Sequence, residues 1–257
     1  MIRILSIALG VFALVATAQA ALAQDASPAT ADPAELFTEQ ERDRIRAEAL
    51  AAILQYPEII EEAMEILEQR RASDALASVL QDPNTPILGN PDATVTLIEF
   101  FDYNCGYCRR MAEPLRELIA TDSELRVIMI ETPILSEESL QAAQASLAVH
   151  MMGSDYSRVH FEAMISSGRA TGSSVLGVAS EMGLNEDALM AIMGGESVRQ
   201  TIAQNYAAMQ AMDISGTPAF IVAGSPTPTT LTRINVLPGA VPVEELRATI
   251  ELTRSGS

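Results

Sequence analysis

Cys105 and Cys108 form a Cys-Gly-Tyr-Cys motif and are the only two cysteines in the chain. The motif follows an apolar, β-prone run over residues 94–101 and precedes a predicted helix over residues 109–120. A sulfur at a helix N-terminus faces unpaired backbone N–H groups and the positive end of the helix dipole, which stabilise its thiolate. This order of strand, paired cysteines and helix is typical of a redox-active dithiol.

The position of each cysteine in the motif predicts its role. Cys105 lies nearest to the helix N-terminus, so we assign it as the attacking thiolate. Cys108 lies three residues farther into the helix and is expected to be the more buried, resolving thiol. Exchange then proceeds by attack on a disulfide, formation of a mixed disulfide, and resolution. Gly106 and Tyr107 lie between the thiols and are expected to tune the stability of the Cys105 anion.

Two structural explanations compete with redox chemistry. A structural disulfide is one, but so short a loop adds little loop-closure entropy. Half of a zinc site is the other, but a structural zinc site needs four ligands, and the chain adds only His150 and His160 to its two cysteines. We therefore predict no metal site and no cofactor. We assign no function to either histidine, since such residues are usually structural.

A second motif lies far downstream, where Pro218 opens an apolar strand and is preceded by Gly216 and Thr217. An ordinary trans proline at a strand start is the alternative explanation. However, this element together with an upstream C-x-x-C closely resembles the thioredoxin superfamily. The resemblance implies that Pro218 is cis and packs against the active-site disulfide. It also implies that Thr217 and Pro218 pair with the backbone of a substrate peptide, as in edge-strand addition.

Two further features indicate a particular branch of this superfamily: Phe100-Phe101 before the cysteines and the large helical segment between the two motifs. From about residue 84 to the C-terminus the chain resembles the DsbA-like bacterial periplasmic thiol–disulfide oxidoreductases. The resemblance implies that the substrates are cysteine-containing exported proteins and that a membrane protein is the redox partner. The DsbA-type oxidant carries Pro-His between its cysteines, whereas this chain carries Gly106-Tyr107, which implies a less extreme thiolate.

Glu99 lies six residues before Cys105, where the family carries a buried acid thought to pass protons to the inner thiol. A surface acid on an edge strand is the alternative, but the neighbouring residues on both sides are apolar. If Glu99 is buried and unpaired, its pKa should rise. The family often places a lysine nearby from the next strand, around Ile130, and this chain contains no lysine.

The pattern of elements predicts an α/β, thioredoxin-like domain over residues 84–257. Residues 94–101 and 125–130 read as parallel strands joined by the active-site helix. A helical insertion is predicted at about 136–212, since 110 residues separate Cys108 from Pro218. A closing hairpin (218–223 and 231–237) and a helix opened by Pro242 complete the fold.

Residues 1–23 read as a cleaved signal peptide. Arg3 supplies the positive charge, residues 4–15 the apolar run, and Ala21-Leu22-Ala23 a small-x-small cleavage site, with Ala18-Gln19-Ala20 as a second candidate. The apolar run is too short for a membrane anchor. A single cysteine pair also suits an oxidising compartment, so we expect export to the periplasm.

Residues 33–80 read as an N-terminal helical region. Thr38 and Glu41 form a capping-box pattern that opens a helix to about Gln55, and Pro57 fits the first turn of a second helix to about Leu80. The second helix carries two short apolar seams, Ile60, Met64 and Leu67, then Ala72, Leu76 and Val79. The proline-rich residues 81–91 are expected to form a hinge.

Two explanations of this region remain open. Its helices pack on the main domain, or they form an interaction arm. The region resembles the N-terminal extension of the ScsC-like members, named for suppression of copper sensitivity. That resemblance implies a homo-oligomer, a trimer, formed through residues 33–80.

The net charge of −18 and the lack of a basic stripe exclude a nucleic-acid partner. The leading prediction is an exported thiol–disulfide oxidoreductase of the isomerase or reductase type. A monomeric DsbA-like oxidase is one alternative. A Cu(I)-binding periplasmic metal-tolerance protein is another, because paired thiolates bind Cu(I) well. A chaperone or adhesion module with a vestigial cysteine pair would leave Pro218 and Glu99 without a purpose.

Overall fold

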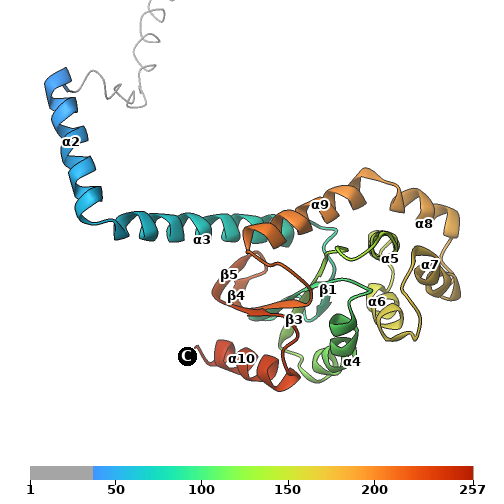
Figure 1. The fold of residues 1–257 in the computed structure, drawn as a ribbon. Helices are drawn as coiled ribbons and strands as arrows, with labels where there is room; N and C mark the ends of the chain where they lie inside the picture. Colours follow the sequence, from blue (N-terminus) through green and yellow to red (C-terminus); the bar gives the residue numbers. More distant parts are fainter. Residues whose placement is uncertain (1–36, 257) are drawn as a thin grey trace, which may run out of the picture. The chain divides into compact units, whose positions relative to one another are not determined.

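The computed structural model describes residues 37–256 (Figure 1). The chain divides into two compact units, Met1–Glu62 and Ala63–Ser257. The predicted signal peptide, residues 1–23, and the start of the predicted helical region, residues 33–36, lie outside the described residues. Within residues 37–256, no helix is both long enough and apolar enough to cross a membrane.

The first unit contains helix α2, Glu39–Gln55. Its predicted capping box is present: the Thr38 hydroxyl accepts from the Glu41 N–H, and the Glu41 carboxylate accepts from the Thr38 N–H. No residue of α2 is buried, and apolar side chains such as Leu50 and Leu54 are exposed. The N-terminus of α2 is therefore capped, but its apolar side chains are not buried.

Helix α3, Glu58–Gln81, carries both predicted seams, and the two differ in burial. The first seam is exposed, with relative accessibilities of 46% for Ile60, 56% for Met64 and 46% for Leu67. In the second seam, Leu76 and Val79 are buried, at 2% and 1%. These two side chains pack with apolar residues of the central sheet. The last turns of α3 therefore belong to the core of the second unit.

Leu76→Ala is expected to lower the free energy of unfolding by about 2–5 kcal/mol, because it leaves a cavity in a closely packed core. Ile66→Ala, at an exposed isoleucine of the same helix that belongs to neither seam, is the matched control and should change stability by less than about 0.5 kcal/mol. Urea denaturation followed by circular dichroism measures both. Equal losses would contradict the packing of the second seam on the sheet.

The second unit is built on one five-stranded sheet with the order β1-β3-β2-β4-β5. β2 and β3 are parallel, as predicted, and the other neighbouring pairs are antiparallel. The predicted closing hairpin is present as β4 and β5, although both strands extend farther than expected, so that their turn is short. The strands are β1 Ile87–Gly89, β2 Val95–Phe101, β3 Leu125–Glu131, β4 Ala219–Thr227 and β5 Thr230–Pro238.

The hinge prediction for residues 81–91 is wrong for the second half of that segment. β1 forms there and pairs with β3. Just before it, the Met129 N–H donates to the Pro86 carbonyl at 3.0 Å, and the Thr85 hydroxyl donates to the Val79 carbonyl at 2.9 Å. Pro86 and Gly89 thus belong to an edge strand and its start, because their backbones pair with β3.

Helices cover both faces of the sheet (Figure 1). α4, Gly106–Thr121, and α10, Val243–Ser255, pack on the face that carries Leu97. The end of α3 and helix α9 pack on the opposite face, which carries Ile98 and Phe100. Every residue of β2 and β3 is buried, as expected of parallel strands covered on both sides.

Five helices lie between β3 and β4, in the predicted helical insertion. Side chains of Ser136, Asp155, Thr171 and Asn185 cap the first four of them by accepting a backbone N–H. Figure 1 shows α5 to α8 grouped beside the sheet, while α9 returns along it toward β4. The helices are α5 Glu137–Met151, α6 Tyr156–Ile165, α7 Gly172–Glu181, α8 Glu186–Met193 and α9 Glu196–Ala211.

Candidate active site

Cys105 is the N-cap residue of α4, with φ −72° and ψ 115°. Its sulfur accepts a hydrogen bond from the Cys108 backbone N–H at 3.4 Å. α4 therefore begins at Gly106, three residues before the predicted start at Arg109, because an N-cap side chain satisfies an otherwise free N–H in the first turn. Both cysteines are reduced and buried, and Cys108 is the more deeply buried of the two.

The two sulfurs lie in opposite electrostatic environments. The pKa of Cys105 falls to about 5, chiefly because the Cys108 side chain hydrogen-bonds to its sulfur, with smaller contributions from backbone groups and Thr217 and with burial opposing the shift. Burial raises the pKa of the Cys108 thiol, and its hydrogen bond to Cys105 and the charge of Glu99 raise it further. At neutral pH, Cys105 is accordingly a thiolate and Cys108 a thiol.

The second motif lies directly against the first. The Thr217–Pro218 peptide bond is cis, as the resemblance implied. In its protonated form the Cys105 thiol donates to the Thr217 carbonyl at 3.2 Å, so two segments 112 residues apart meet at one sulfur. Pro218 is buried and directly precedes β4, which pairs with β2. The strand that leads to the cysteines and the strand that follows the proline are thus neighbours in the sheet.

Glu99 lies in β2 and is only 2% exposed, so the alternative of a surface acid is excluded. Burial raises its pKa to about 8, and repulsion by the Cys105 thiolate contributes to the rise. The charge of Glu99 in turn raises the pKa of Cys108. In the register of the parallel pair, Glu99 lies opposite Met129. Met129 of β3, an apolar residue, is therefore the neighbour of Glu99 on the next strand, and no lysine pairs with Glu99 from there.

The two residues between the cysteines are exposed. A Cβ at Gly106 would meet only the end of Arg110, at 3.9 Å, so this position has open space around it. The Arg110 guanidinium lies 4.1 Å from the centroid of the Tyr107 ring, within the range of a cation–π contact. The sequence analysis did not anticipate this positive charge beside Tyr107.

A buried polar cluster under the site was also missed. Tyr103 and Tyr156 both donate to one carboxylate oxygen of Glu131, at 3.1 and 2.8 Å, and the Tyr103 hydroxyl lies 3.4 Å from His160 Nδ1. Burial raises the pKa of Glu131 and lowers that of His160 to about 3. His160 is therefore neutral and structural. The available signal was Glu131 at the end of an apolar strand that was predicted to stop at Ile130.

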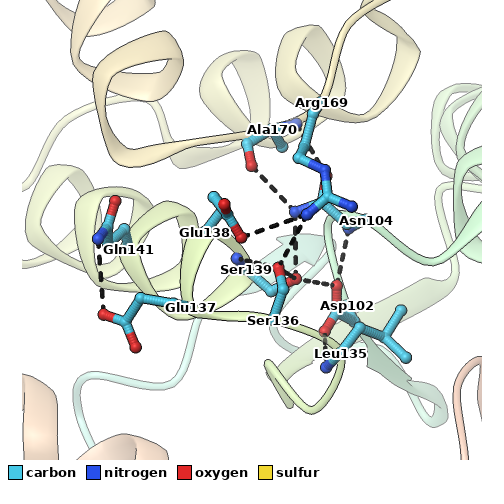
Figure 2. Close-up of polar contacts among 10 residues, drawn as sticks. All are labelled: Asp102, Asn104, Leu135, Ser136, Glu137, Glu138, Ser139, Gln141, Arg169 and Ala170. Atoms are coloured by element: carbon cyan, nitrogen blue, oxygen red, sulfur yellow. Dashed lines mark hydrogen bonds and ion pairs between the residues drawn. The ribbon is translucent and has the colours of Figure 1, made fainter.

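The loop between β2 and Cys105 holds two further residues that sequence reasoning did not single out. Asp102 and Asn104 hydrogen-bond to the helical insertion from both sides of Tyr103 (Figure 2). Their signal was a pair of polar side chains between a buried strand and a reactive cysteine. Within the part of the chain that the structure describes, no group of three or more His, Cys, Asp or Glu residues could hold a metal ion.

The fold and the site define a thioredoxin-like domain with a buried pair of free cysteines at the start of a helix. Residues 96–251 match the model of the DSBA-like thioredoxin domain family, and the chain belongs to this family. It therefore carries a thiol–disulfide oxidoreductase domain of the DsbA-like class.

Solved structures show the same fold. A thioredoxin-like oxidoreductase from Silicibacter pomeroyi is 37% identical, with a TM-score of 0.61, and the match covers 70% of this chain and 98% of that chain. BcfH of Salmonella enterica Typhimurium is 26% identical (TM-score 0.59; 87% and 100% covered). ScsC of Proteus mirabilis in a transitional conformation is 24% identical (TM-score 0.59; 87% and 99% covered), and at that identity the likeness shows the fold alone.

The chain also matches part of some Na⁺/H⁺ antiporters. NhaA 1 of Salinispora arenicola is 25% identical over 146 residues, which is 56% of this chain and 22% of the antiporter. NhaA of Herminiimonas arsenicoxydans is 26% identical over 187 residues, 28% of its length. This chain thus spans about a quarter of the length of the curated relatives it matches.

Proposed function

We propose that this protein exchanges disulfides with cysteine-containing protein substrates, with Cys105 as the attacking thiolate and Cys108 as the resolving thiol. The observation that carries this proposal is the N-cap position of Cys105. There, backbone and side-chain donors lower the pKa of its sulfur, whereas burial raises the pKa of Cys108. One sulfur of the pair is thus charged and nucleophilic at neutral pH while the other keeps its proton.

The reaction balances as two sulfur displacements. The Cys105 thiolate attacks one sulfur of a substrate disulfide, forms a mixed disulfide and expels the other substrate sulfur as a thiolate. Glu99 has a pKa of about 8, so its ionised form is the minor one at neutral pH, and this form takes the proton of the Cys108 thiol. Cys108 then attacks the Cys105 sulfur, which expels the second substrate thiolate. The protein leaves with a Cys105–Cys108 disulfide. The two substrate thiolates become thiols by taking one proton from Glu99 and one from the solvent. Oxidation of a substrate follows the same steps in reverse.

Thr217 and Pro218 are proposed to bind the substrate backbone. The Thr217 carbonyl accepts a hydrogen bond from the Cys105 thiol, and a thiolate has no proton to donate. Ionisation of Cys105 thus leaves this carbonyl free to accept an N–H from an extended peptide. Such main-chain pairing gives affinity without a strong preference for sequence.

The reduction potential of the Cys105–Cys108 couple tests the proposed function. Glutathione redox buffers at neutral pH should show a reversible two-electron equilibrium at a potential between those of an oxidant, about −120 mV, and a reductant, about −270 mV. Catalysed reduction of insulin should accompany it. A cysteine pair that does not equilibrate with glutathione, in a chain without effect on insulin, would overturn the proposal.

Within this class we propose the isomerase or reductase type, working as a homo-oligomer, for which a trimer is the expected state. Two features support this. The site carries Gly106 and Tyr107 where the oxidant type carries Pro-His. The first seam of α3 (Ile60, Met64 and Leu67) is exposed and offers apolar surface to other copies. Facing active sites would enclose a misfolded client and shield each thiolate from a strong oxidase.

The proposed site of action is the periplasm, with a membrane protein as redox partner. Support comes from the signal-peptide pattern of residues 1–23 and from a structural neighbour described as a periplasmic thioredoxin-like protein from Salmonella enterica. N-terminal sequencing of the exported protein tests this location, and a chain that begins at Gln24 is the expected result.

Glu99→Gln is expected to slow the resolution step by roughly 10²-fold, because an amide cannot accept the Cys108 proton. Quenched-flow measurement of mixed-disulfide decay between pH 6 and 8 follows this step. The alkylation midpoint of Cys105 should stay near 5, since Glu99 is still neutral where Cys105 titrates. Glu113→Gln, an exposed acid of α4, is the matched control. Unchanged decay across this pH range would exclude Glu99 as the proton acceptor.

The same variant changes the pH dependence of stability. The pKa of Glu99 is about 8 in the folded protein against an ordinary value of 4.5. Between these values the folded chain holds a proton that the unfolded chain has released, so stability falls as pH rises from about 5 to about 8. Glu99→Gln should therefore flatten the stability profile over this window and stabilise the protein at its upper end.

A further inference from the structure

We propose that Asn104 is a positioning residue that ties the active-site cysteine to the helical insertion, so that the insertion fixes the orientation of the Cys105 thiolate. The inference rests on the proposed role of Cys105 as the attacking sulfur. It concerns the 102–104 loop, which joins the end of β2 to the N-cap of α4.

Both polar groups of the Asn104 side chain hydrogen-bond to the backbone of a single residue, Ala170. Its Nδ2 donates to the Ala170 carbonyl at 2.9 Å, and its Oδ1 accepts from the Ala170 N–H at 2.9 Å. Ala170 is fully buried and lies between α6 and α7. Two opposed hydrogen bonds define the relative position of the two segments better than one, so the residue next to Cys105 is held firmly against the α6–α7 connection (Figure 2).

Asp102 holds the same loop from its other end. One carboxylate oxygen accepts the Asn104 N–H and the Ser139 hydroxyl, both at 2.7 Å. The other oxygen accepts the Leu135 N–H at 3.0 Å. Ser139 lies in the first turn of α5 and also accepts from Asn104 Nδ2 at 3.1 Å. The N-terminus of α5 therefore bonds to both ends of the loop (Figure 2), and its dipole favours the Asp102 carboxylate.

These contacts reach the reactive sulfur through the backbone. The Cys105 N–H donates to the Asp102 carbonyl at 3.0 Å, so the loop closes on the cysteine itself. Cys105 must keep its N-cap conformation for its sulfur to lie 3.4 Å from the Cys108 N–H. A thiolate is stabilised by such donors only while it faces them. Loss of the Asn104 bonds would let the loop shift and would weaken the contacts that favour the anion.

Asn104→Ala removes the three side-chain hydrogen bonds and is the main test. The acidity constant of the Cys105 thiol is expected to fall about tenfold, seen as a shift of about one pH unit in its alkylation and thiolate absorbance. Since the reduced form is then less stabilised, the equilibrium with glutathione should move toward the protein disulfide by about the same factor. A residue that only supported the fold would change neither quantity.

Three further variants make the result interpretable. Asn90→Ala removes an asparagine whose side chain bonds to the backbone of Ser123 and Asp92, just before β3 and β2. This is the end of β2 opposite to the 102–104 loop, so the variant should lower stability without changing the pKa of the Cys105 thiol. Arg169→Ala changes the neighbour of Ala170. In this network the Arg169 side chain bonds only to Ser136 and Glu138, so this variant should also leave the pKa of the Cys105 thiol unchanged. Ser139→Ala should give a smaller shift in the same direction, and it serves if Asn104→Ala folds poorly.

The outcomes separate this inference from the proposed function. If wild-type Cys105 shows no depressed pKa, the role of Cys105 is wrong and the inference fails with it. If wild type shows it but Asn104→Ala and Ser139→Ala leave both the alkylation midpoint and the glutathione equilibrium unchanged, only the inference fails. A shift in these two variants, with Asn90→Ala and Arg169→Ala unchanged, establishes Asn104 as the residue through which the insertion acts on Cys105.

Discussion

Cys105→Ser is expected to reduce disulfide exchange to the rate of the solution without protein. A serine hydroxyl is not ionised near neutral pH and does not attack disulfides, whereas the pKa of Cys105 is about 5 and leaves its sulfur charged. Reduction of insulin and recovery of activity by a scrambled disulfide protein both measure this loss. The variant should fold normally, because a serine hydroxyl at the N-cap can accept the hydrogen bond from the Cys108 N–H in place of the sulfur.

Changes at Cys108 should have a different effect. Cys108→Ser keeps the attacking thiolate but removes the resolving sulfur, so mixed disulfides with substrates should accumulate and be visible on non-reducing gels. The side-chain hydrogen bond from Cys108 is the largest cause of the lowered pKa of Cys105. Cys108→Ala, which loses that donor, should therefore raise the alkylation midpoint of Cys105 more than Cys108→Ser does. If Cys108 is alkylated first in the wild type, the two roles are reversed.

A triple substitution in the first seam of α3, Ile60→Glu with Met64→Glu and Leu67→Glu, is expected to convert the proposed homo-oligomer to a monomer. Each apolar side chain buried between copies contributes about 1.5–3 kcal/mol, and three carboxylates at the same positions repel one another. Light scattering measures the mass. Disulfide isomerisation should fall at least several-fold, while reduction of a small disulfide compound stays at the wild-type rate.

This design keeps the catalytic domain intact. A chain shortened to begin at residue 84 would lose Leu76 and Val79, which pack on the sheet, so a loss of activity would have two explanations. Arg71→Glu adds negative charge at an exposed position of the same helix and is the matched control. If the triple variant keeps the wild-type mass and isomerase activity, the seam is not an interface. A wild type that is itself a monomer would favour the DsbA-like oxidase.

Elements with strong local signals were predicted well. The apolar run before the cysteines and the next apolar run are parallel strands, and the capping pattern at Thr38 marks a real helix start. The physical reason is that propensity, capping and hydrophobic periodicity act over a few residues. The start of α4 was misplaced by three residues, because a cysteine is not an ordinary N-cap and its role depends on the N–H it meets.

Contacts between distant segments were less accessible from sequence. The two seams of α3 have the same spacing, yet one is exposed and the other is part of the core. Residues 81–91 looked like a hinge because prolines and glycine mark turns, but an edge strand pairs there with β3. In both cases the structure of the segment depends on the part of the sheet that it contacts. A local sequence pattern does not reveal this contact.

The sequence by itself pointed to redox chemistry at Cys105 and Cys108, because a C-x-x-C between strand and helix has few other chemical uses. The resemblance to the thioredoxin superfamily added the fold class and the candidate residues Glu99 and Pro218. Only the tertiary structure decided how these groups affect one another. It set the buried environment that raises the pKa of Glu99 to about 8, and it brought Thr217 to Cys105 across 112 residues and Ala170 to Asn104 across 66. Burial and long-range hydrogen bonds arise only when the chain has folded, so no local pattern encodes them.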